Sequence, residues 1–533
     1  MNKKIQKYNL IKLVCVSSVV ASACFSGSVN AELNDITTSP NTLNAGIQKS
    51  LEQQVGAGRG DINTPGSSMY IIKRDPFRSV RRGRQIFQRK FQLKQGLGPR
   101  TNDGEGNLDT DGSLGAGLTD SCGGCHGRPR GSAGFGGDVF TRPDSRDAPH
   151  LFGLGQVEML ADEMTTDLRA IRDTAITKAQ SKDKKISLKL KSKGTNYGQI
   201  IAFPDGSVDT SKVVGVDDDL RVKPFFAQGA TISMREFIVG AFNAEMGLES
   251  PDVDLEAASA GSDVLTPAGM WLTGSQDSIE APPVHTVFED SDNDGVFNEL
   301  DTAIIDHTEF YFLNYFSPAT YKQGYVEKKG KALMARIGCT SCHTPNMTIE
   351  NDRRVGNVET KYDAKNGIFN NLFATVTGTF DETDDSSGFP TLKTPQGNSF
   401  KVKGLYADFK RHDLGPKFWE RNFDGTMQKE FMTEPLWGVG STSPYGHDGR
   451  SINLHEVIVR HGGEASKVTK RYKRLGVVGQ SFVQAYLRSL VLFPPDDTAS
   501  NLNPGDSMAE NFPQNGHGNI KLPVLFNDPT EGE

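Results

Sequence analysis

Apolar residues recur every three to four positions in several stretches of the chain, and this period predicts amphipathic helices. Glycine opens the first and the fourth of these stretches. The third and the fifth stop shortly before prolines, which cannot continue a helix. The predicted helices lie at about 83–91, 233–246, 310–315, 330–338 and 482–490.

A second pattern, the alternation of apolar and polar residues, occurs at 186–190 and predicts a strand. Residues 199–203 are its expected partner, because the turn sequence Pro204-Asp205-Gly206 follows them. This pair makes a small β-hairpin in a chain whose other strong patterns are helical. The expected fold class is therefore mainly α, with a β-hairpin insertion in the first half.

The N-terminus has the pattern of a secretory signal peptide. Four lysines precede the apolar stretch 13–25, and Val29-Asn30-Ala31 has the small residues of a cleavage site. The apolar core is too short to span a bilayer, and no later apolar run is long enough. A rival interpretation makes Cys24 a lipidated N-terminus, although the usual large aliphatic residue three positions earlier is missing. Export implies a bacterial periplasm or an equivalent compartment.

The length of 533 residues is enough for two or three domains. The formal charge of −7 becomes −11 once the four lysines of residues 1–31 are removed. This acidity argues against a nucleic-acid partner. An acidic surface suits a basic electron-donor protein, and it also serves solubility.

The pattern C-x-x-C-H occurs twice in the chain. Two thiols at this spacing can each add to a vinyl group of haem, and the adjacent histidine can bind the iron from the same side. A lone C-x-x-C would also fit a redox pair or half a zinc site. Here histidine follows both times, and the remaining two of the six cysteines lie in the leader. The sequence therefore predicts two covalent haem c groups, attached through Cys122, Cys125, Cys339 and Cys342, with His126 and His343 as iron ligands.

A further repeat indicates that the chain is duplicated. Residues 149–155 (Pro-His-Leu-Phe-Gly-Leu-Gly) follow the first motif, and residues 435–440 (Pro-Leu-Trp-Gly-Val-Gly) follow the second. A glycine-opened helix before a haem motif resembles the first helix of cytochromes c. We expect two cytochrome c-like domains between a flexible extension and a polar tail. The expected divisions are 1–31 signal peptide, 32–75 extension, 76–318 first domain, 319–498 second domain and 499–533 tail.

Residues 290–301 (Asp-Ser-Asp-Asn-Asp-Gly-Val-Phe-Asn-Glu-Leu-Asp) match a calcium loop. Oxygen donors fall at the expected positions, and glycine stands sixth, where such a loop turns sharply. The last ligand is aspartate rather than the longer glutamate. A solvated acidic turn is the alternative interpretation. The candidate ligands are Asp290, Asp292, Asp294, Val296, Asn298 and Asp301.

Taken together, the motifs resemble the bacterial di-haem cytochrome c peroxidase superfamily. The stretches 443–450 (Ser-Pro-Tyr-Gly-His-Asp-Gly-Arg) and 454–458 (Leu-His-Glu-Val-Ile) carry this resemblance. Residues 96–100, 151–155 and 461–465 are similar to its large branch, the di-haem oxidoreductases often labelled thiol oxidoreductases. The resemblance covers about residues 76–495. A thiol substrate gains no support, because no cysteine after the leader lies outside the two motifs.

The resemblance implies ligands for the far faces of the haems. His461 takes the position of a methionine ligand in the peroxidases, at the end of a helix that starts at residue 454, so we expect a bis-His second haem. His447 resembles a family residue near a haem propionate and is expected to be structural or electron-relaying rather than a ligand. No histidine lies between His126 and His150, so the first iron is expected to be open unless His150 reaches it. An open haem would react, and a closed haem would pass electrons.

The resemblance also implies an acid–base glutamate and a calcium ion between the haems. Glu245, in the Glu-Met pair that ends the predicted helix 233–246, is the first choice for moving a proton during peroxide cleavage, and Glu158 is the second. The family's tryptophan between the haems is replaced by the stretch 225–229, which leaves Trp437 as an alternative bridge. The calcium ligands would be Asp147, Thr442 and Pro444.

The leading interpretation is a periplasmic di-haem oxidoreductase of the peroxidase type. Electrons would enter at the second haem from a small donor protein or a quinol-linked carrier. One alternative is an oxygenase that resembles the rubber-cleaving dioxygenases, because an aromatic pocket would suit dioxygen. The other is a pure electron carrier, which would need both irons closed. Peroxide or dioxygen would be the substrate, and the aromatic residues in question are Phe225, Phe226, Phe237 and Phe242.

Overall fold

The computed structural model describes part of the chain. The leader, the extension before residue 55 and the C-terminal tail lie outside this part, so their predictions stay open. No helix within the described part combines the length and the apolar character that crossing a bilayer requires. The described residues are 55–91, 95–97, 119–127, 138–139, 146–291, 295–297, 299–314, 319–320, 322–362, 372–422 and 425–491.

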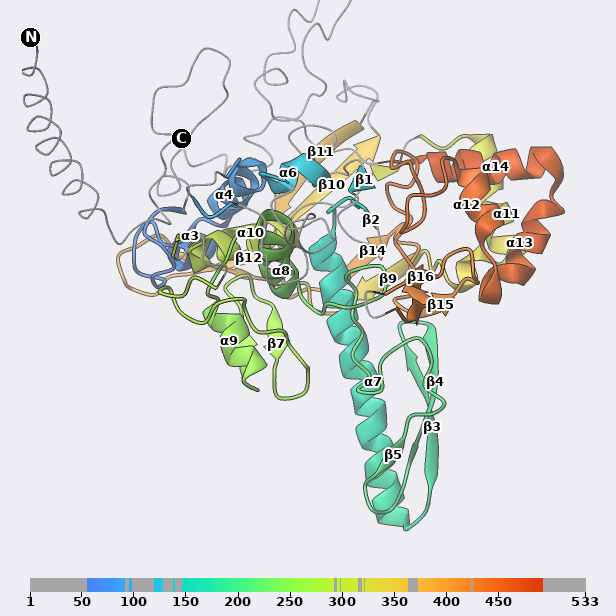
Figure 1. Ribbon diagram of the computed structural model, residues 1–533, viewed down its shortest axis with the longest axis horizontal. Coiled ribbons are helices and arrows are strands. Elements are labelled where there is room, and N and C mark those ends of the chain that lie inside the picture. Colours follow the sequence, from blue (N-terminus) through green and yellow to red (C-terminus); the bar gives the residue numbers. More distant parts are fainter. Residues whose placement is uncertain are drawn as a thin grey trace, which may run out of the picture.

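The helices form two groups, one for each half of the chain (Figure 1). The first group holds α3 Ser68–Arg74, α4 Pro76–Gln88, α6 Cys122–His126, α7 Leu154–Lys182, α8 Met234–Met246, α9 Val253–Ser259 and α10 Thr302–Asn314. The second group lies at the opposite end of the molecule. It holds α11 Tyr325–Ile337, the 3₁₀ turn η3 Cys339–Ser341, α12 Leu454–Arg460, the 3₁₀ turn η4 Gly463–Ala465, α13 Ser466–Lys473 and α14 Gly476–Arg488.

The strands form small antiparallel sheets rather than one large sheet. The three-stranded sheet is β3 Ile186–Ser192, β4 Thr195–Ala202 and β5 Val208–Asp209. The remaining strands pair two by two: β1 Asp138–Val139 with β2 Arg146–Asp147, β6 Asp263–Leu265 with β7 Trp271–Thr273, β8 Ala319–Thr320 with β19 Leu490–Val491, β9 Asn346–Ile349 with β14 Phe400–Lys403, β10 Gly356–Tyr362 with β11 Leu372–Gly378, β12 Phe380–Thr383 with β13 Leu392–Pro395, β15 Arg411–Asp413 with β18 Glu430–Met432, and β16 Glu420–Arg421 with β17 Met427–Gln428.

The predicted fold class, mainly α, is wrong. In the part of the chain that the structure describes, about 38% of residues are helical and 18% are in strands, which is a mixed composition. The strands of residues 346–432 account for much of the difference, since the sequence pattern predicted none of them. Most are two to four residues long, and alternation over so few residues cannot be told from chance.

In each half, a glycine lets the first helix cross the last one at close range. A Cβ atom on Gly83 of α4 would overlap the carbonyl oxygen of His307 in α10 and approach Tyr311. In the second half, a Cβ on Gly330 of α11 would overlap the carbonyl of Phe482 in α14 and approach Tyr486. Both crossings thus use a glycine against two residues one turn apart. This equivalence is the physical counterpart of the repeat in the sequence.

The glycine-rich repeat after each motif makes a second equivalent contact. Gly155 lies against the carbonyl of Leu313, two residues after Tyr311. Gly440 lies against the carbonyl of Arg488, two residues after Tyr486. Each repeat therefore packs on the C-terminal end of the last helix in its own half, where a side chain would not fit.

The apolar core is divided unequally. A small cluster in the second helical group is built around Met334, Tyr472 and Val483. The larger cluster fills the first group, and it also takes in residues from the second half, among them Leu405 and Trp437. The strand-rich part of the second half therefore packs against the first half, so the two halves share an extensive interface.

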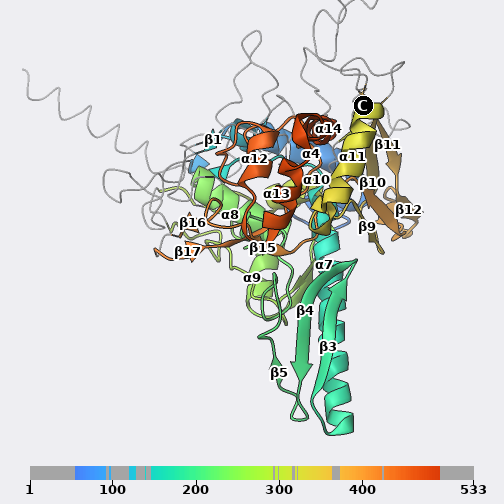
Figure 2. The same cartoon turned by 90° about the vertical axis from the view of Figure 1, so that its right-hand side faces the viewer.

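The predicted hairpin is present and projects from the body beside the long helix α7 (Figures 1 and 2). Lys193 and Gly194, whose φ angles are 45° and 90°, make the turn between its two long strands, and the predicted turn at 204–206 follows the second of them. The turn at Lys193 and Gly194 points back toward the body. The hydroxyl of Tyr197 donates to the carbonyl of Phe409 at 2.9 Å, so the hairpin supports the segment 405–412.

A buried ionic network holds the first helical group together. Arg235 at the start of α8 is 0% exposed and lies 2.6 Å from Asp252 and 2.9 Å from Glu309. Asp306, on the same helix as Glu309, lies 3.0 Å from the guanidinium. Removing one partner would leave a buried charge uncompensated, so the network fixes α8 against α10.

The helix crossing at Gly330 gives a direct test. We expect Gly330→Ala to lower the free energy of unfolding by roughly 1–3 kcal/mol, because the added methyl group forces α11 away from the Phe482 carbonyl. Gly240→Ala is the matched control, since this glycine is exposed within α8 with nothing near its Cβ position. Alanine should stabilise that helix by up to about 1 kcal/mol. Equal effects in chemical denaturation would contradict the close crossing.

Candidate functional site

Each C-x-x-C-H motif forms a helical turn. Cys122 and Cys125 lie one turn apart in α6, so both side chains project from one face of the helix. Cys339 opens the turn η3, and Cys342 closes it. All four thiols are free and partly buried. Both pairs therefore present two sulfur atoms toward the same side, as attachment to one haem requires.

Three histidines share a feature that suits an iron ligand. Each Nδ1–H donates to a backbone carbonyl, His126 to Pro149 at 2.7 Å, His343 to Tyr406 at 2.9 Å and His461 to Val457 at 2.7 Å. This bond leaves the lone pair on Nε2, the atom that binds a metal in such an arrangement.

The electrostatics favour the same neutral form of these rings. Burial lowers the pKa of His126 and of His461, although the carbonyl bond of each opposes this shift. Burial, helped by the nearby His461, lowers the pKa of His343 to about 4 against the opposing effect of the bond to Tyr406. The two histidines of the second site therefore lie close together and are neutral at pH 7. The residues present fit a bis-His haem.

The other candidate ligands of the second site, His412 and His447, contact carboxylates instead. Both ring nitrogens of His412 face carboxylates, Nε2 at 3.0 Å from Asp408 and Nδ1 at 2.9 Å from Glu464. His447 has its Nε2 at 2.8 Å from a carboxylate oxygen of Glu420. Neither arrangement leaves that nitrogen for iron, so the geometry favours His461.

His412 belongs to a cluster that the sequence did not indicate. Donor atoms of Cys342, Asp408 and His412 lie within 4.8 Å of one another. Burial alone would lower the pKa of His412, but its hydrogen bonds to Asp408 and Cys342 raise it to about 11. Thiol, carboxylate and imidazole could hold a metal, but Cys342 belongs to the haem motif. The cluster therefore places an imidazole paired with a carboxylate beside the second motif.

The first proximal histidine is joined to the second half of the chain. His126 donates to the carbonyl of Pro149, and the next residue, His150, lies with its Nε2 3.0 Å from the carbonyl of Trp437. The Nδ1 of His150 accepts from the amide of Phe152 at 3.3 Å. Both nitrogens of His150 are therefore used, and neither faces an open position for iron.

The same path continues to the second proximal histidine. Leu436, which precedes Trp437, donates its amide to the carbonyl of Leu405 at 3.0 Å. Leu405 precedes Tyr406, whose carbonyl accepts from Nδ1 of His343. Backbone and hydrogen bonds thus run without a break from His126 to His343, and we call this connection the proximal path.

Two close contacts hold the proximal path in place. A Cβ on Gly153 would stand 2.9 Å from the buried ring of Trp437, so glycine is needed for the two halves to meet here. Tyr406 adopts φ 56°, which is rare for a bulky residue. Its hydroxyl pairs with that of Tyr486 in a buried contact. Surrounding contacts therefore hold Tyr406 in the left-handed region, which is unfavourable for a bulky residue.

The two candidate acid–base glutamates lie at opposite ends of α8. Glu245 is half-buried near its C-terminal end, and its charge is one of the factors that raise the pKa of Cys125, after burial. Glu158 accepts from the amide of Met234 at the other end, at 2.8 Å. The two ends are about 16 Å apart. Glu245 is therefore the one beside the first motif.

Glu158 has the surroundings of a structural residue. Its side chain is 1% exposed, and burial raises its pKa well above the usual range, with Asp162 and Glu309 adding to the shift. One carboxyl oxygen has no hydrogen-bond partner among the described residues. A neutral, enclosed carboxyl group fits an anchor for the start of α8 better than a group that meets substrate.

The predicted aromatic stretch separates into two clusters. Phe237 contacts Phe226 and Phe225, with ring centroids 4.9 and 6.2 Å apart. Phe242 instead contacts Phe91, at 5.9 Å. The pocket that the oxygenase alternative supposes stays a prediction.

Both calcium predictions rest partly on residues outside the described ranges. Asp292, Asp294 and Asn298 lie outside, and so does the side chain of Asp147. Within the loop, Gly295 has a φ of 87° and donates to Asp290, as the sixth position of such a loop would. Asp301 caps the start of α10 through Ala303. Thr442 and Pro444 flank Ser443 in a half-buried loop. Both sites stay predictions.

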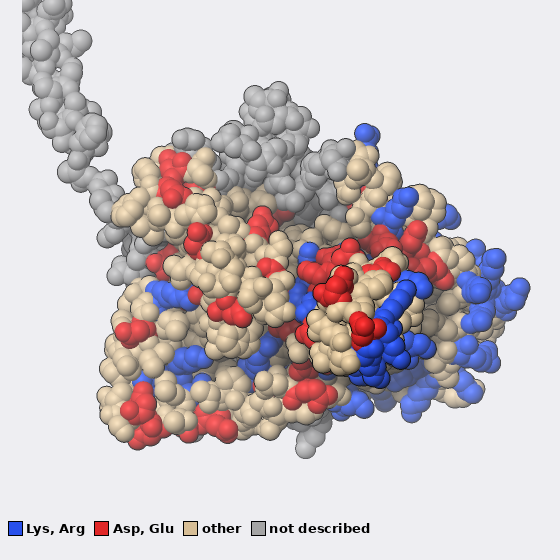
Figure 3. Space-filling view, turned by 90° about the horizontal axis from the view of Figure 1, so that it is seen from below, with Lys and Arg blue, Asp and Glu red and all other residues tan. Residues whose placement is uncertain are grey.

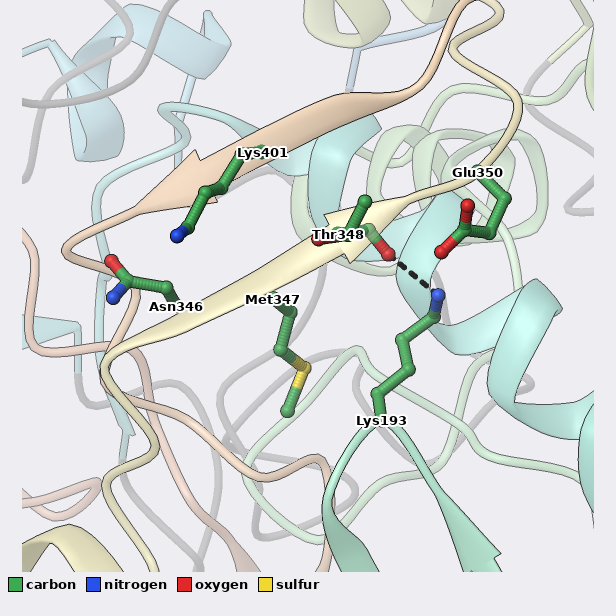
Figure 4. A pocket seen from close by; sticks show the side chains of 6 residues that line it. All are labelled: Lys193, Asn346, Met347, Thr348, Glu350 and Lys401. Atoms are coloured by element: carbon green, nitrogen blue, oxygen red, sulfur yellow. Dashed lines mark hydrogen bonds between the residues drawn. The ribbon is translucent and has the colours of Figure 1, made fainter.

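A surface cavity of about 450 Å³ lies between the hairpin turn and β9 (Figure 4). Lys193 reaches across it to the carbonyl of Thr348 at 2.6 Å and pairs with Glu163. None of the candidate haem residues lines this cavity. Its lysine therefore has a structural use, which is to hold the hairpin turn against the second half.

Comparison with known proteins supports one part of this picture. A protein family described as "Di-haem oxidoreductase, putative peroxidase" matches residues 348–490. No curated protein matches the chain. The matched segment holds His412, His447 and His461 and begins just after the second C-x-x-C-H motif. This match supports the di-haem oxidoreductase branch that the sequence resembles, and with it haem as cofactor and an oxidoreductase activity at the level of the family.

A ligand variant tests the second site. His461→Ala should convert one low-spin ferric signal to high-spin and leave the other haem unchanged, because the iron loses its second imidazole. His412→Ala is the matched control, since its two nitrogens already face carboxylates. It should keep the wild-type spin state. Magnetic resonance of the ferric proteins reads both outcomes, and a low-spin signal that survives in the His461 variant would refute the assignment.

A second pair of variants tests the proximal path. His150→Ala should lower stability by roughly 1–3 kcal/mol, because the buried carbonyl of Trp437 loses its donor. It should also slow electron exchange between the haems. His150→Gln can restore a donor and should recover much of both losses. If the alanine variant exchanges electrons at the wild-type rate in pulsed reduction, electrons do not use this path.

Proposed function

We propose that this chain is a periplasmic di-haem oxidoreductase of the peroxidase type. The observation that carries the proposal is the proximal path, which joins His126 of the first motif to His343 of the second. Two attachment motifs linked in this way suit an enzyme that reacts at one site and receives electrons at the other. A pure carrier would need a second ligand at both sites.

The two sites differ in what the chain offers on the far face. His461 lies near His343 and has its Nε2 lone pair available for the iron. Beside His126, the nearest candidate in the sequence, His150, has both nitrogens occupied by backbone groups. The first site is therefore assigned as the reaction site, and the second as the site where electrons enter.

When bound, haem supplies iron that can bind a small oxygen-containing substrate and change its oxidation state. The cysteines of each motif hold that group, and His126 fixes its orientation through the bond to Pro149. Glu245 lies close enough to Cys125 for its charge to act on that thiol, which places a carboxylate at the edge of the first site.

Glu245 has the chemistry for the proton step. Reducing one peroxide to two waters consumes two electrons and two protons. A carboxylate at the site can take the proton from one peroxide oxygen and return it to the other, which then leaves as water. The electrons arrive one at a time from the second site. Glu158 stays the second candidate for this role, because it is enclosed and accepts from the amide of Met234.

Paired glutamate variants test this function. Glu245→Gln should lower peroxide turnover by ~10²-fold or more, because proton transfer by a positioned group is lost. Cyanide binding to the first haem should persist, since the iron stays accessible. Glu158→Gln is the matched control and should turn over normally, because glutamine still accepts from the Met234 amide.

The outcomes separate the candidate functions. Wild-type holoprotein that does not reduce peroxide with any donor would contradict the peroxidase assignment. Consumption of dioxygen instead would favour the oxygenase. Equal loss of turnover in both glutamate variants would show that Glu245 acts only through the fold.

A further inference from the structure

Basic side chains gather on the helices that surround the second motif. Figure 3 shows Lys and Arg concentrated at the end of the molecule that α11, α13 and α14 form in Figure 1. Residues 325–337 and 466–474 together contain nine basic residues and one acidic residue. We define the basic face by six of these basic side chains, which are all exposed: Lys328, Lys331, Arg336, Lys467, Lys470 and Lys473.

The charges of the basic face are not neutralised by acidic side chains within the described part of the chain, although the ammonium group of Lys331 lies over the ring of Tyr486, 5.9 Å from its centroid. None of the six makes an ion pair with an acid there, whereas many other arginines do. Unpaired lysines on one face produce a local positive potential that is strongest at low ionic strength. The chain as a whole carries a net charge of −7, so its charge is segregated rather than evenly mixed. The net charge alone suggested a basic partner, whereas the basic face indicates a partner with an acidic surface.

The basic face lies directly over the second attachment motif. Helix α11 ends at Ile337, just before Cys339, and Arg471 of α13 donates to the carbonyl of Ile337 at 3.2 Å. Val468 of α13 packs in the same apolar cluster as Cys339. The exposed lysines of α13 are thus about one helix diameter, roughly 10 Å, from the motif.

Two exposed apolar residues adjoin these charges. Val477 and Val478, at the start of α14, are 83% and 66% exposed, and they follow Arg474 closely in the chain. A small apolar contact beside charged residues is the composition of a transient interface. The charges speed up encounter, and the apolar contact holds the complex briefly.

We propose that the basic face docks a small acidic redox protein that delivers electrons to the second haem. The proposal rests on the proposed function and adds the chemistry of its partner. Each encounter moves one electron, so the donor is oxidised by one electron and the second site is reduced by one. Two encounters supply the two electrons that the reduction of one peroxide molecule consumes. A quinol-linked carrier needs no such charged surface.

Charge-reversal variants of the holoprotein test the docking. Lys467→Glu, Lys470→Glu and Lys473→Glu are combined on the basic face. Lys178→Glu, Lys182→Glu and Lys184→Glu are combined as the control, because these exposed lysines lie at the far end of α7 and change the net charge equally. Stopped-flow absorbance then measures haem reduction by reduced flavodoxin, an acidic donor, and by reduced cytochrome c, a basic donor.

With flavodoxin at low salt, we expect the basic-face variant to react ~10-fold or more slowly than wild type, and the control to stay within about twofold. Added salt should slow the wild-type reaction and remove this difference. Equal losses in the two variants, or a faster reaction with the basic donor, would overturn the proposal. It would also be overturned if wild type bound anionic lipid vesicles through these lysines while its rate with flavodoxin was unaffected by their reversal.

A small neutral quinol keeps the two proposals apart. Peroxide turnover with this donor needs no protein docking, so both lysine variants should match wild type. If wild type fails to turn over with the quinol, the proposed function is wrong. If turnover with the quinol is intact but the rate of haem reduction by flavodoxin is unchanged by the lysine substitutions, only the docking proposal is wrong.

Discussion

The structure depends on the bond from each histidine that we propose as a proximal ligand, His126 and His343, to a backbone carbonyl. It fixes the proton on Nδ1, turns Nε2 toward the iron position and sets the ring's orientation. A carbonyl can do this only if its own segment is rigid. Tyr406, which carries the carbonyl for His343, is accordingly held in a left-handed conformation by its buried contact with Tyr486. The two carbonyls also belong to one proximal path, so the halves of the chain cannot be positioned independently.

The architecture follows from this requirement. Glycines at the helix crossings and in the repeats allow backbone to meet backbone within each half, where any side chain would force the packed segments apart. The hairpin that projects beside α7 also helps to hold this region in place, because the hydroxyl of Tyr197 donates to the carbonyl of Phe409, just after Tyr406. Arg235 and its carboxylates hold α8, the helix that carries Glu245. Supporting contacts from distant parts of the sequence thus converge on the two motifs.

The sequence predicted what depends on local spacing and missed what depends on long-range contact. The helices near 233–246, 330–338 and 482–490, the strand at 186 and the C-x-x-C-H turns all follow from short patterns. The helical fold class failed because strands of two to four residues leave no readable alternation. Long-range pairs were also invisible. Nothing in the sequence linked Asp408 to Cys342, or Glu158 to the start of α8, and only the folded chain shows that Glu158 and Glu245 lie near opposite ends of that helix.

The most direct test of this account is the ferric magnetic resonance spectrum of the purified wild-type protein. In this account only the second haem has a second axial ligand. The spectrum should therefore show one low-spin signal from a bis-His iron and one high-spin signal from an open iron, in equal amounts. Two low-spin signals would contradict the open first site and leave an electron carrier. A protein without haem signals would contradict the account as a whole.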